Sequence, residues 1–167
     1  PYTEKKMNNL DFSLDSEGNG YVLALVYNDE STKKYKKGVI NFHIELIKIN
    51  GETGDVTTSP IELGDKNINS ISLYENGQNY MTCVGFYANS KNASSAEGIF
   101  VFKLDSEGNI TDEISHEIPV EVLNQYVKGK KAAKNVKKED QGKDVDFDNL
   151  KMRDLLFMED GSIVITA

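Results

Sequence analysis

The sequence predicts an all-β fold, and three observations indicate it. Apolar and polar residues alternate in several short stretches, such as Phe42, Ile44 and Leu46, with the two-residue period of a half-buried strand. Two runs, YVLALVY (21–27) and YMTCVGFY (80–87), are apolar almost throughout, which is typical of strands covered on both faces. Glycine-containing turn signals separate these stretches: SEGNG, NGETGD, ENGQN, SEGN and EDGS.

The strands recur in two copies of a four-strand meander. A shift of 59 positions places Phe12–Leu14 on Ile71–Leu73 and Gly18 on Gly77, and a shift of 55 places Ile49 on Leu104. A third copy begins within 152–167, where Gly161 matches Gly77 at a shift of 84. The expected strands are 10–14, 21–27, 39–49 and 56–63 in the first copy, and 70–74, 80–87, 99–104 and 110–118 in the second.

The hexapeptide LDSEGN occurs at 14–19 and again at 104–109. The first occurrence joins strands one and two of its copy, whereas the second joins strands three and four. The identity therefore indicates a turn used twice, opened by Asp and Ser and closed by Gly and Asn at positive φ. A calcium loop is disfavoured because its twelfth position, counted from Asp15, is Val26 inside a buried strand. We predict no metal site.

Tandem four-strand antiparallel units are the sequence signature of β-propeller blades. The predicted fold is a partial β-propeller, with two blades and the start of a third, and the alternative is a β-sandwich. Residues 1–167 are expected to form one partial propeller domain that belongs to a longer chain, interrupted by a Lys-rich helical insertion at 119–149. The open sheet edges would then be completed by the rest of the protein or by another chain.

The chain resembles the uncharacterised β-propeller-like proteins of the Bacteroidetes cell envelope. The segments that carry the resemblance are DSEGNGYVLALVY, EIPVEVLNQYV with KGKKAAKNVKK, and NLKMRDLLFMEDGSIVITA. The resemblance implies export to the cell envelope or secretion, and no established catalytic activity. The chain departs from the family at its last segment, which lacks the Glu that usually continues the strand.

Charge concentrates in the connections expected at one end of the sheets. In a meander, the connections after strands two and four lie at the same end. Segments 28–38, 88–98 and 119–143 carry a net charge of +6 in a chain whose total is −8. The insertion is expected to begin as a helix with Val120, Leu123 and Val127 on one face, and Gly129 to weaken it. The candidate partner-binding residues are Lys33, Lys34, Lys36, Lys37, Lys130, Lys131 and Lys134.

The remaining residues that could carry catalysis or ligand binding are expected to have structural roles. His43 and His116 have no evident acid or thiol partner, and Cys83 is expected to be a buried, inert thiol. The tyrosines at the ends of the second strands are interpreted as packing residues; they are Tyr21, Tyr27, Tyr80 and Tyr87. The acidic run is interpreted as a solvated loop; it consists of Asp144, Asp146, Asp148 and Asp154. We predict no catalytic residues and no cofactor.

These expectations favour a non-catalytic binding or scaffold module of the cell envelope. Its basic end would bind an anionic partner, either a protein or a polysaccharide, and not nucleic acid, because the net charge is −8. No run of 18 apolar residues predicts a transmembrane segment. The alternative is part of a glycan-active or other hydrolytic enzyme whose active site lies in further blades.

Overall fold

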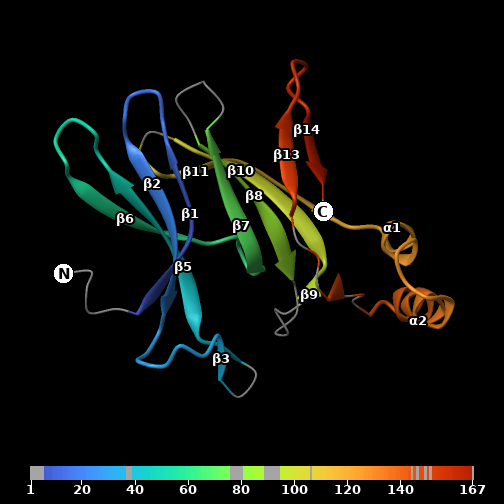
Figure 1. Ribbon diagram of the computed structural model, residues 1–167. Coiled ribbons are helices and arrows are strands. Elements are labelled where there is room, and N and C mark those ends of the chain that lie inside the picture. The colour runs from blue at the N-terminus through green and yellow to red at the C-terminus, as the bar shows by residue number, and fades with distance from the viewer. Residues whose placement is uncertain are drawn as a thin grey trace.

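Two four-stranded antiparallel sheets form the body of the protein (Figure 1). The computed structural model describes residues 6–36, 39–75, 81–88, 95–105, 107–143, 145, 147–148, 150 and 152–166. Within these residues the order along the chain is four long strands, four more long strands, two helices and a final hairpin, with two-residue strands in the connections. The predicted all-β fold and its two four-stranded sheets are confirmed.

The first sheet has the strand order β1-β2-β5-β6, and the second has the order β7-β8-β10-β11. Each is a meander in which consecutive long strands pair antiparallel. The strands of the first sheet are β1 (Met7–Leu14), β2 (Gly20–Tyr27), β5 (Phe42–Ile49) and β6 (Val56–Ile61). Those of the second are β7 (Asn67–Glu75), β8 (Met81–Ala88), β10 (Gly98–Leu104) and β11 (Ile110–Glu117).

Shorter pairs complete the described chain. A two-residue ladder, β3 (Tyr35–Lys36) with β4 (Val39–Ile40), lies in the connection between β2 and β5. Another joins β9 (Ser95–Ala96) to β12 (Phe147–Asp148), which ties the end of the helical segment to the second sheet's connections. The last element is a hairpin of β13 (Asp154–Phe157) and β14 (Ile163–Thr166), in the segment where a third copy was predicted to begin.

One hydrophobic core joins the two sheets. The first sheet contributes Leu23 and Leu46, which lie opposite each other on adjacent strands, and the second contributes Phe100 and Phe102. The two phenylalanine rings stack with centroids 5.5 Å apart, and all four side chains are fully buried. Alternate side chains of each strand therefore supply the core between the sheets, as the two-residue period predicts.

The second strands of both sheets are the most deeply buried elements. Every described side chain of β8 is buried, and so are five consecutive residues of β2, Leu23 to Tyr27. β8 has a neighbouring strand on each side and is covered on both faces, which explains why its sequence lacks polar alternation. The prediction made from the two apolar runs is correct for these strands.

The repeated hexapeptide forms the same hydrogen-bonded turn at both sites. Asp15 Oδ1 accepts from the backbone N–H groups of Glu17 (2.9 Å) and Asn19 (2.8 Å). Asp105 Oδ1 accepts in the same way from Glu107 (2.9 Å) and Asn109 (2.8 Å). The two glycines have φ of 83° and 91°, whereas the asparagines do not have positive φ. The prediction that Asn closes the turn at positive φ is wrong: its side-chain amide instead donates to the Asp carboxylate.

Two short helices replace the single amphipathic helix expected after Pro119. α1 (Val120–Asn124) is one turn long, and α2 (Gly129–Glu139) follows after a break. Val120 and Leu123 are buried against Ile118 and Val145, as the predicted apolar face requires, but Val127 lies beyond the end of α1. Gly129 begins the second helix and does not weaken the first, because the chain has already left helical conformation before it.

The connections sort to opposite ends of the sheets. In Figure 1 the tight turns β1–β2, β5–β6 and β13–β14 lie at the upper end. The connection that carries β3 lies at the lower end, and α1 and α2 project sideways from the lower half of the body. This arrangement follows from antiparallel meanders, in which alternate connections share an end. The two lysine-bearing connections therefore extend from the same half of the molecule.

Candidate binding surfaces

The lysines of α2 share one face of the helix. They are spaced i, i+1, i+4, i+7 and i+8, and at about 100° per residue this spacing covers a sector of roughly 120°. All are exposed except Lys138, which is half-buried. We call this surface the lysine face; it consists of Lys130, Lys131, Lys134, Lys137 and Lys138.

Neutral contacts on the other side hold α2 in place. Asn135 is buried, and its Nδ2 donates to Asn124 Oδ1 at 2.9 Å. Asn124 Nδ2 in turn donates to the carbonyl of Ala132 at 3.4 Å. α1 itself is fixed by its buried Val120 and Leu123. These amide contacts between Asn124 and α2 join the two helices without using a lysine side chain.

The first lysine-bearing connection is organised by a buried asparagine. Asn41 Nδ2 donates to Asp29 Oδ1 (3.0 Å) and to the carbonyl of Lys33 (3.0 Å). Asp29 also accepts from the backbone N–H of Ser31 (2.8 Å) and forms an ion pair with Lys36. The Lys36 ammonium, followed by the Asn41 amide, holds the pKa of Asp29 well below its usual range. Lys36 is thus engaged within its own connection, while Lys33 and Lys34 are exposed.

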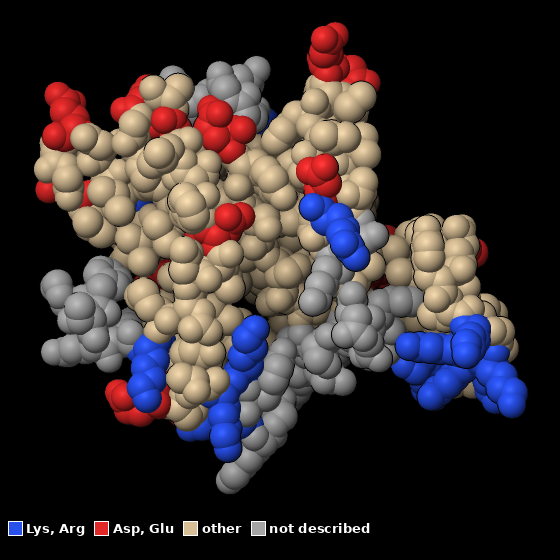
Figure 2. Space-filling model, in the orientation of Figure 1, with Lys and Arg blue, Asp and Glu red and all other residues tan. Residues whose placement is uncertain are grey.

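The structure brings the candidate lysines together as two groups. Lys130, Lys131 and Lys134 belong to the lysine face, and Lys33, Lys34 and Lys36 belong to the first connection. Figure 2 shows basic side chains in two places, at the lower end of the body and on the helical projection. Lys37 lies outside the described residues. The described candidates therefore lie in two separate groups.

The opposite end of the molecule is acidic. Figure 2 shows red side chains over the upper hairpins. Several of these carboxylates are turn residues whose oxygens accept backbone N–H groups, so their position follows from turn chemistry. The acidic residues of the described tight turns are Asp15, Glu17, Glu52, Asp55, Asp105, Glu107, Glu159 and Asp160.

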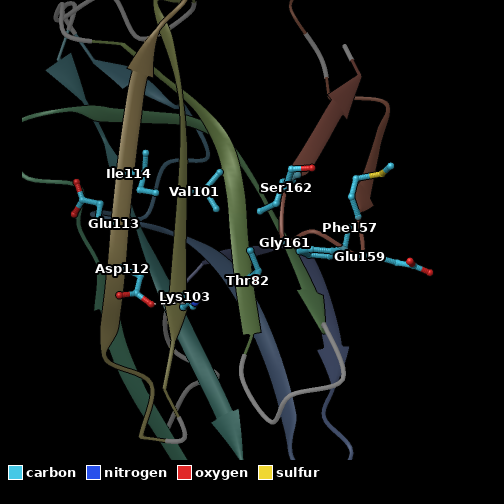
Figure 3. Close-up of a pocket in the computed structure, with 12 residues that line it drawn as sticks. Thr82, Val101, Lys103, Asp112, Glu113, Ile114, Phe157, Glu159, Gly161 and Ser162 are labelled. Atoms are coloured by element: carbon cyan, nitrogen blue, oxygen red, sulfur yellow. Dashed lines mark ion pairs between the residues drawn. The ribbon is translucent and has the colours of Figure 1, made fainter.

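A groove of about 650 Å³ lies between the second sheet and the C-terminal hairpin (Figure 3). Its floor includes Val101 and Ile114, and Phe157 and Ile163 line its hairpin side. The Phe157 ring meets the Tyr74 ring edge to face, with centroids 6.4 Å apart, which fixes the hairpin over β7. Lys103 and Asp112, on adjacent strands, form an ion pair of 3.0 Å at the edge of the groove. Sequence reasoning missed this groove because it depends on how the hairpin packs.

The first sheet exposes an apolar face on the side away from the core. Phe12 and Leu14 of β1 are 69% and 65% exposed, and Ile49 and Val56 are also exposed. Strand pairing places Phe12 opposite Val22, and Leu14 and Ile49 opposite Gly20, so these side chains share one face. An exposed group of this kind marks a contact surface more often than isolated apolar residues do.

The histidines and the cysteine have structural surroundings. His43 lies between Asn28 Oδ1 (2.8 Å from Nδ1) and Glu45 Oε1 (2.8 Å from Nε2). The prediction that His43 has no acid partner is wrong: Glu45, two residues along the same strand, points to the same side of the sheet and pairs with its ring. His116 lies in β11 of the other sheet. Cys83 is fully buried, and burial raises the pKa of its thiol.

The bracketing tyrosines pack with their hydroxyls near polar groups. The Tyr21 hydroxyl donates to Asp15 Oδ2 at 3.0 Å, and Asn8 Nδ2 donates to the Tyr27 hydroxyl at 3.1 Å. Tyr87 lies beneath the Lys66 ammonium, 5.4 Å from its ring centroid. Tyr80, Asp144, Asp146 and the side chain of Asp148 lie outside the described part of the chain. Asp154 accepts from the N–H of Leu155 at 2.9 Å.

Comparison of the chain with protein-family models, with curated proteins and with solved structures gives no match. Within the described ranges, no group of three or more His, Cys, Asp or Glu residues could hold a metal ion. Neither of the two described helices has the length and apolar character needed to cross a bilayer.

Proposed function

We propose that the protein is a non-catalytic binding module of the bacterial cell envelope, and that the lysine face of α2 binds a polyanionic partner. The observation that carries the proposal is the grouping of five lysines on one side of an 11-residue helix that projects from the body. The whole chain has a net charge of −8, so its overall composition does not account for this local concentration of positive charge. Concentrated positive charge attracts polyanions and releases their counterions.

The partner most compatible with this surface is an acidic polysaccharide. Regularly spaced carboxylate or sulfate groups along an extended polymer match lysines that recur along a helix of about 16 Å. Ammonium groups on long, flexible side chains suit such repeated contacts and do not require a fixed bidentate geometry. Lys33 and Lys34 form a separate patch on the first connection and would add a weaker second contact.

We also propose that the two sheets and the hairpin are successive blades of a partial β-propeller. Residues that match under the sequence shifts differ in exposure in one consistent way. Leu73 and Leu104 are buried between the sheets, whereas their matches Leu14 and Ile49 are exposed on the outer face of the first sheet. The same apolar positions thus lie at the interface between the sheets in the second sheet and on an open face in the first. This pattern supports a stack that continues beyond the first sheet.

The binding proposal is tested by affinity for polygalacturonate and dextran sulfate at several salt concentrations. Changing Lys130 and Lys134 together to Gln keeps the helix but removes two charges from the lysine face. We expect affinity to fall about tenfold and the salt dependence to become shallower. The matched control changes Lys33 and Lys34 to Gln, which removes the same charge from another surface.

The control separates a specific face from overall charge. If both pairs reduce affinity equally, net charge and not the lysine face determines binding, and the assignment to α2 is wrong. If neither pair changes affinity, the polyanion proposal is wrong. The envelope location rests on the resemblance to envelope proteins, and fractionation of cells that express the native gene tests it directly.

A further inference from the structure

An exposed aromatic side chain lies where the chain passes from α1 to α2. Tyr126 is 84% exposed, the largest fraction among the described large hydrophobic residues. Val122, one helical turn earlier, is also exposed. A tyrosine ring has a broad apolar surface, and most tyrosines bury a large part of it. The Tyr126 ring therefore offers a flat apolar surface to a ligand.

Backbone and core contacts fix the place of this ring. The N–H of Tyr126 donates to the carbonyl of Leu123 at 3.3 Å, which continues the last turn of α1. Leu123 and Val120 are buried in the small core of the helical segment, so the turn that carries the ring is anchored. A tyrosine side chain has only two rotatable angles and loses little conformational entropy when a ligand binds it.

The lysine face begins close to this ring. Its first residue, Lys130, is four positions after Tyr126, so their Cα atoms lie at most about 14 Å apart. Between them, the carbonyl of Lys128 accepts from the N–H of Lys131 at 2.8 Å, at the start of α2. Figure 2 shows basic side chains on the lower part of the helical projection, directly below a mostly uncharged part. One short stretch of polymer can therefore contact both the ring and the lysine face.

The surroundings of the ring contain cations and amides but no carboxylate from the same segment. No Asp or Glu occurs from Val122 to Lys138, a stretch that contains six lysines. Gln125 is exposed next to Tyr126, and an amide side chain can donate to and accept from hydroxyl groups. An apolar cover over this surface would remove water from the lysines at a high cost in free energy. The surface therefore favours a hydrated, anionic ligand.

We propose that Tyr126 is a sugar-stacking residue, and that together with the lysine face it recognises uronic acid units of a polysaccharide. This inference rests on the proposed function and names the feature of the partner that the site recognises. A uronic acid ring presents a C–H face, hydroxyl groups and a carboxylate. The C–H face packs on the Tyr126 ring, the hydroxyls bond to Gln125, and the carboxylate meets Lys128 or Lys130. A polyanion without sugar rings can use the lysines alone.

Two polymers with the same charged group separate these contributions. Polygalacturonate carries its carboxylates on sugar rings, whereas polyglutamate carries them on flexible side chains. At equal length and salt concentration, the native chain should bind polygalacturonate more tightly. Tyr126→Ala should weaken polygalacturonate binding about fivefold and leave polyglutamate binding within about twofold. Because no charge is removed, the salt dependence of both affinities should stay the same.

Three variants and one spectroscopic signal serve as controls. Tyr126→Phe keeps the ring and should restore most of the affinity for polygalacturonate. Phe12→Ala removes an exposed ring from the first sheet and should leave both affinities unchanged. Changing Lys130 and Lys134 together to Gln should weaken the binding of both polymers. In NMR spectra of trigalacturonate, the native chain should shift the sugar protons upfield through the ring current, and Tyr126→Ala should not.

The outcomes distinguish a failure of this inference from a failure of the proposed function. If the double lysine variant weakens both polymers and Tyr126→Ala weakens neither, the lysine face binds polyanions but Tyr126 has no stacking role. Equal native affinities for the two polymers, or a Tyr126→Phe variant as weak as Tyr126→Ala, would also overturn sugar stacking. If the native chain binds neither polymer, the proposed function is wrong and this inference falls with it. Thermal unfolding checks that each variant is folded, as substitutions at exposed positions should be.

Discussion

The backbone N–H of Leu73 donates to the carboxylate of Asp11, with 2.9 Å between the nitrogen and Oδ2. This bond joins the first strands of the two sheets, which lie next to each other. The other oxygen, Oδ1, accepts from the N–H of Phe12 at 2.9 Å. The pairing of β1 with β2 shifts between Asn9 and Asp11, so Asp11 directly follows an irregularity that turns its carboxylate toward β7.

Replacing Asp11 with Ala should destabilise the protein by about 1–3 kcal/mol, because a partly buried N–H group loses a charged acceptor. Urea unfolding followed by circular dichroism measures the change. Ser70 is the matched control, since it occupies the equivalent position under the shift of 59. Its buried Oγ has no hydrogen-bond partner among the described residues, so Ser70→Ala should be neutral or stabilising. Equal losses for both variants would contradict this account.

Leu14 and Leu73 test the relation between the two sheets. The residues match under the shift of 59 and differ in exposure, at 65% and 4%. Leu73→Ala should cost about 2–4 kcal/mol, because it leaves a cavity in the shared core. Leu14→Ala should stay within about 0.5 kcal/mol, as surface substitutions do. The measurement is the free energy of unfolding of the isolated chain; a large loss for Leu14→Ala would mean that another contact covers that face.

The two identical hexapeptides provide a further matched pair. Both Asp15 and Asp105 accept from two backbone N–H groups and one Asn side chain, but Asp15 also accepts from the Tyr21 hydroxyl. Tyr21 and Asn19 are buried, whereas Asn109 of the Asp105 turn is exposed. Asp15→Ala should therefore lower the thermal midpoint more than Asp105→Ala does. Similar midpoints for the two variants would show that the Tyr21 contact contributes little.

The same carboxylates predict acid sensitivity. Burial raises the pKa of Asp15, but hydrogen bonds from Asn19, Tyr21 and Glu17 outweigh it and leave the pKa below its ordinary value. The Asn109 side chain and backbone lower the pKa of Asp105. Because the folded values lie below the unfolded ones, this stabilisation is present above about pH 4 and is lost as pH falls through the folded pKa.

Unfolding in urea between pH 2 and pH 6 tests this sign. The native chain should lose stability below about pH 4, and a chain with Asn at both positions should show a shallower decline. The double variant should also be less stable than the native chain at pH 6, where the charged acceptors are missing. A steeper decline in the double variant would contradict the assignment of lowered pKa values to these two groups.

The strands could be predicted from sequence because their signals are local. The two-residue period of Phe42, Ile44 and Leu46 and the apolar run of β8 gave ranges that agree with the structure to within a few residues. Glycine marked the turns for the same reason, since positive φ at Gly18 and Gly108 is a local requirement. The end of the molecule that carries the long connections then followed from antiparallel pairing alone.

The features that escaped prediction depend on distant residues. The lysine spacing in α2 contained a helical face, but the break before Gly129 that isolates this helix was not evident. The pairing of Lys36 with Asp29, which engages one of the candidate lysines, depends on how Asn41 folds the connection. The groove depends on the contact of Phe157 with Tyr74, 83 positions away in the chain. No local pattern encodes such a contact.

Asn41 should control the shape of the first lysine-bearing connection. Its buried amide group lies within hydrogen-bond distance of Asp29 Oδ1, Ser31 Oγ and the Lys33 carbonyl. Asn41→Ala removes one donor from each of these acceptors and should cost about 1–3 kcal/mol of stability. Amide hydrogen exchange should accelerate in Asn28–Lys36 and remain unchanged in α2. Lys36→Gln, which breaks only the exposed ion pair with Asp29, should have a much smaller effect, and the reverse order would show that the ion pair and not Asn41 holds the connection.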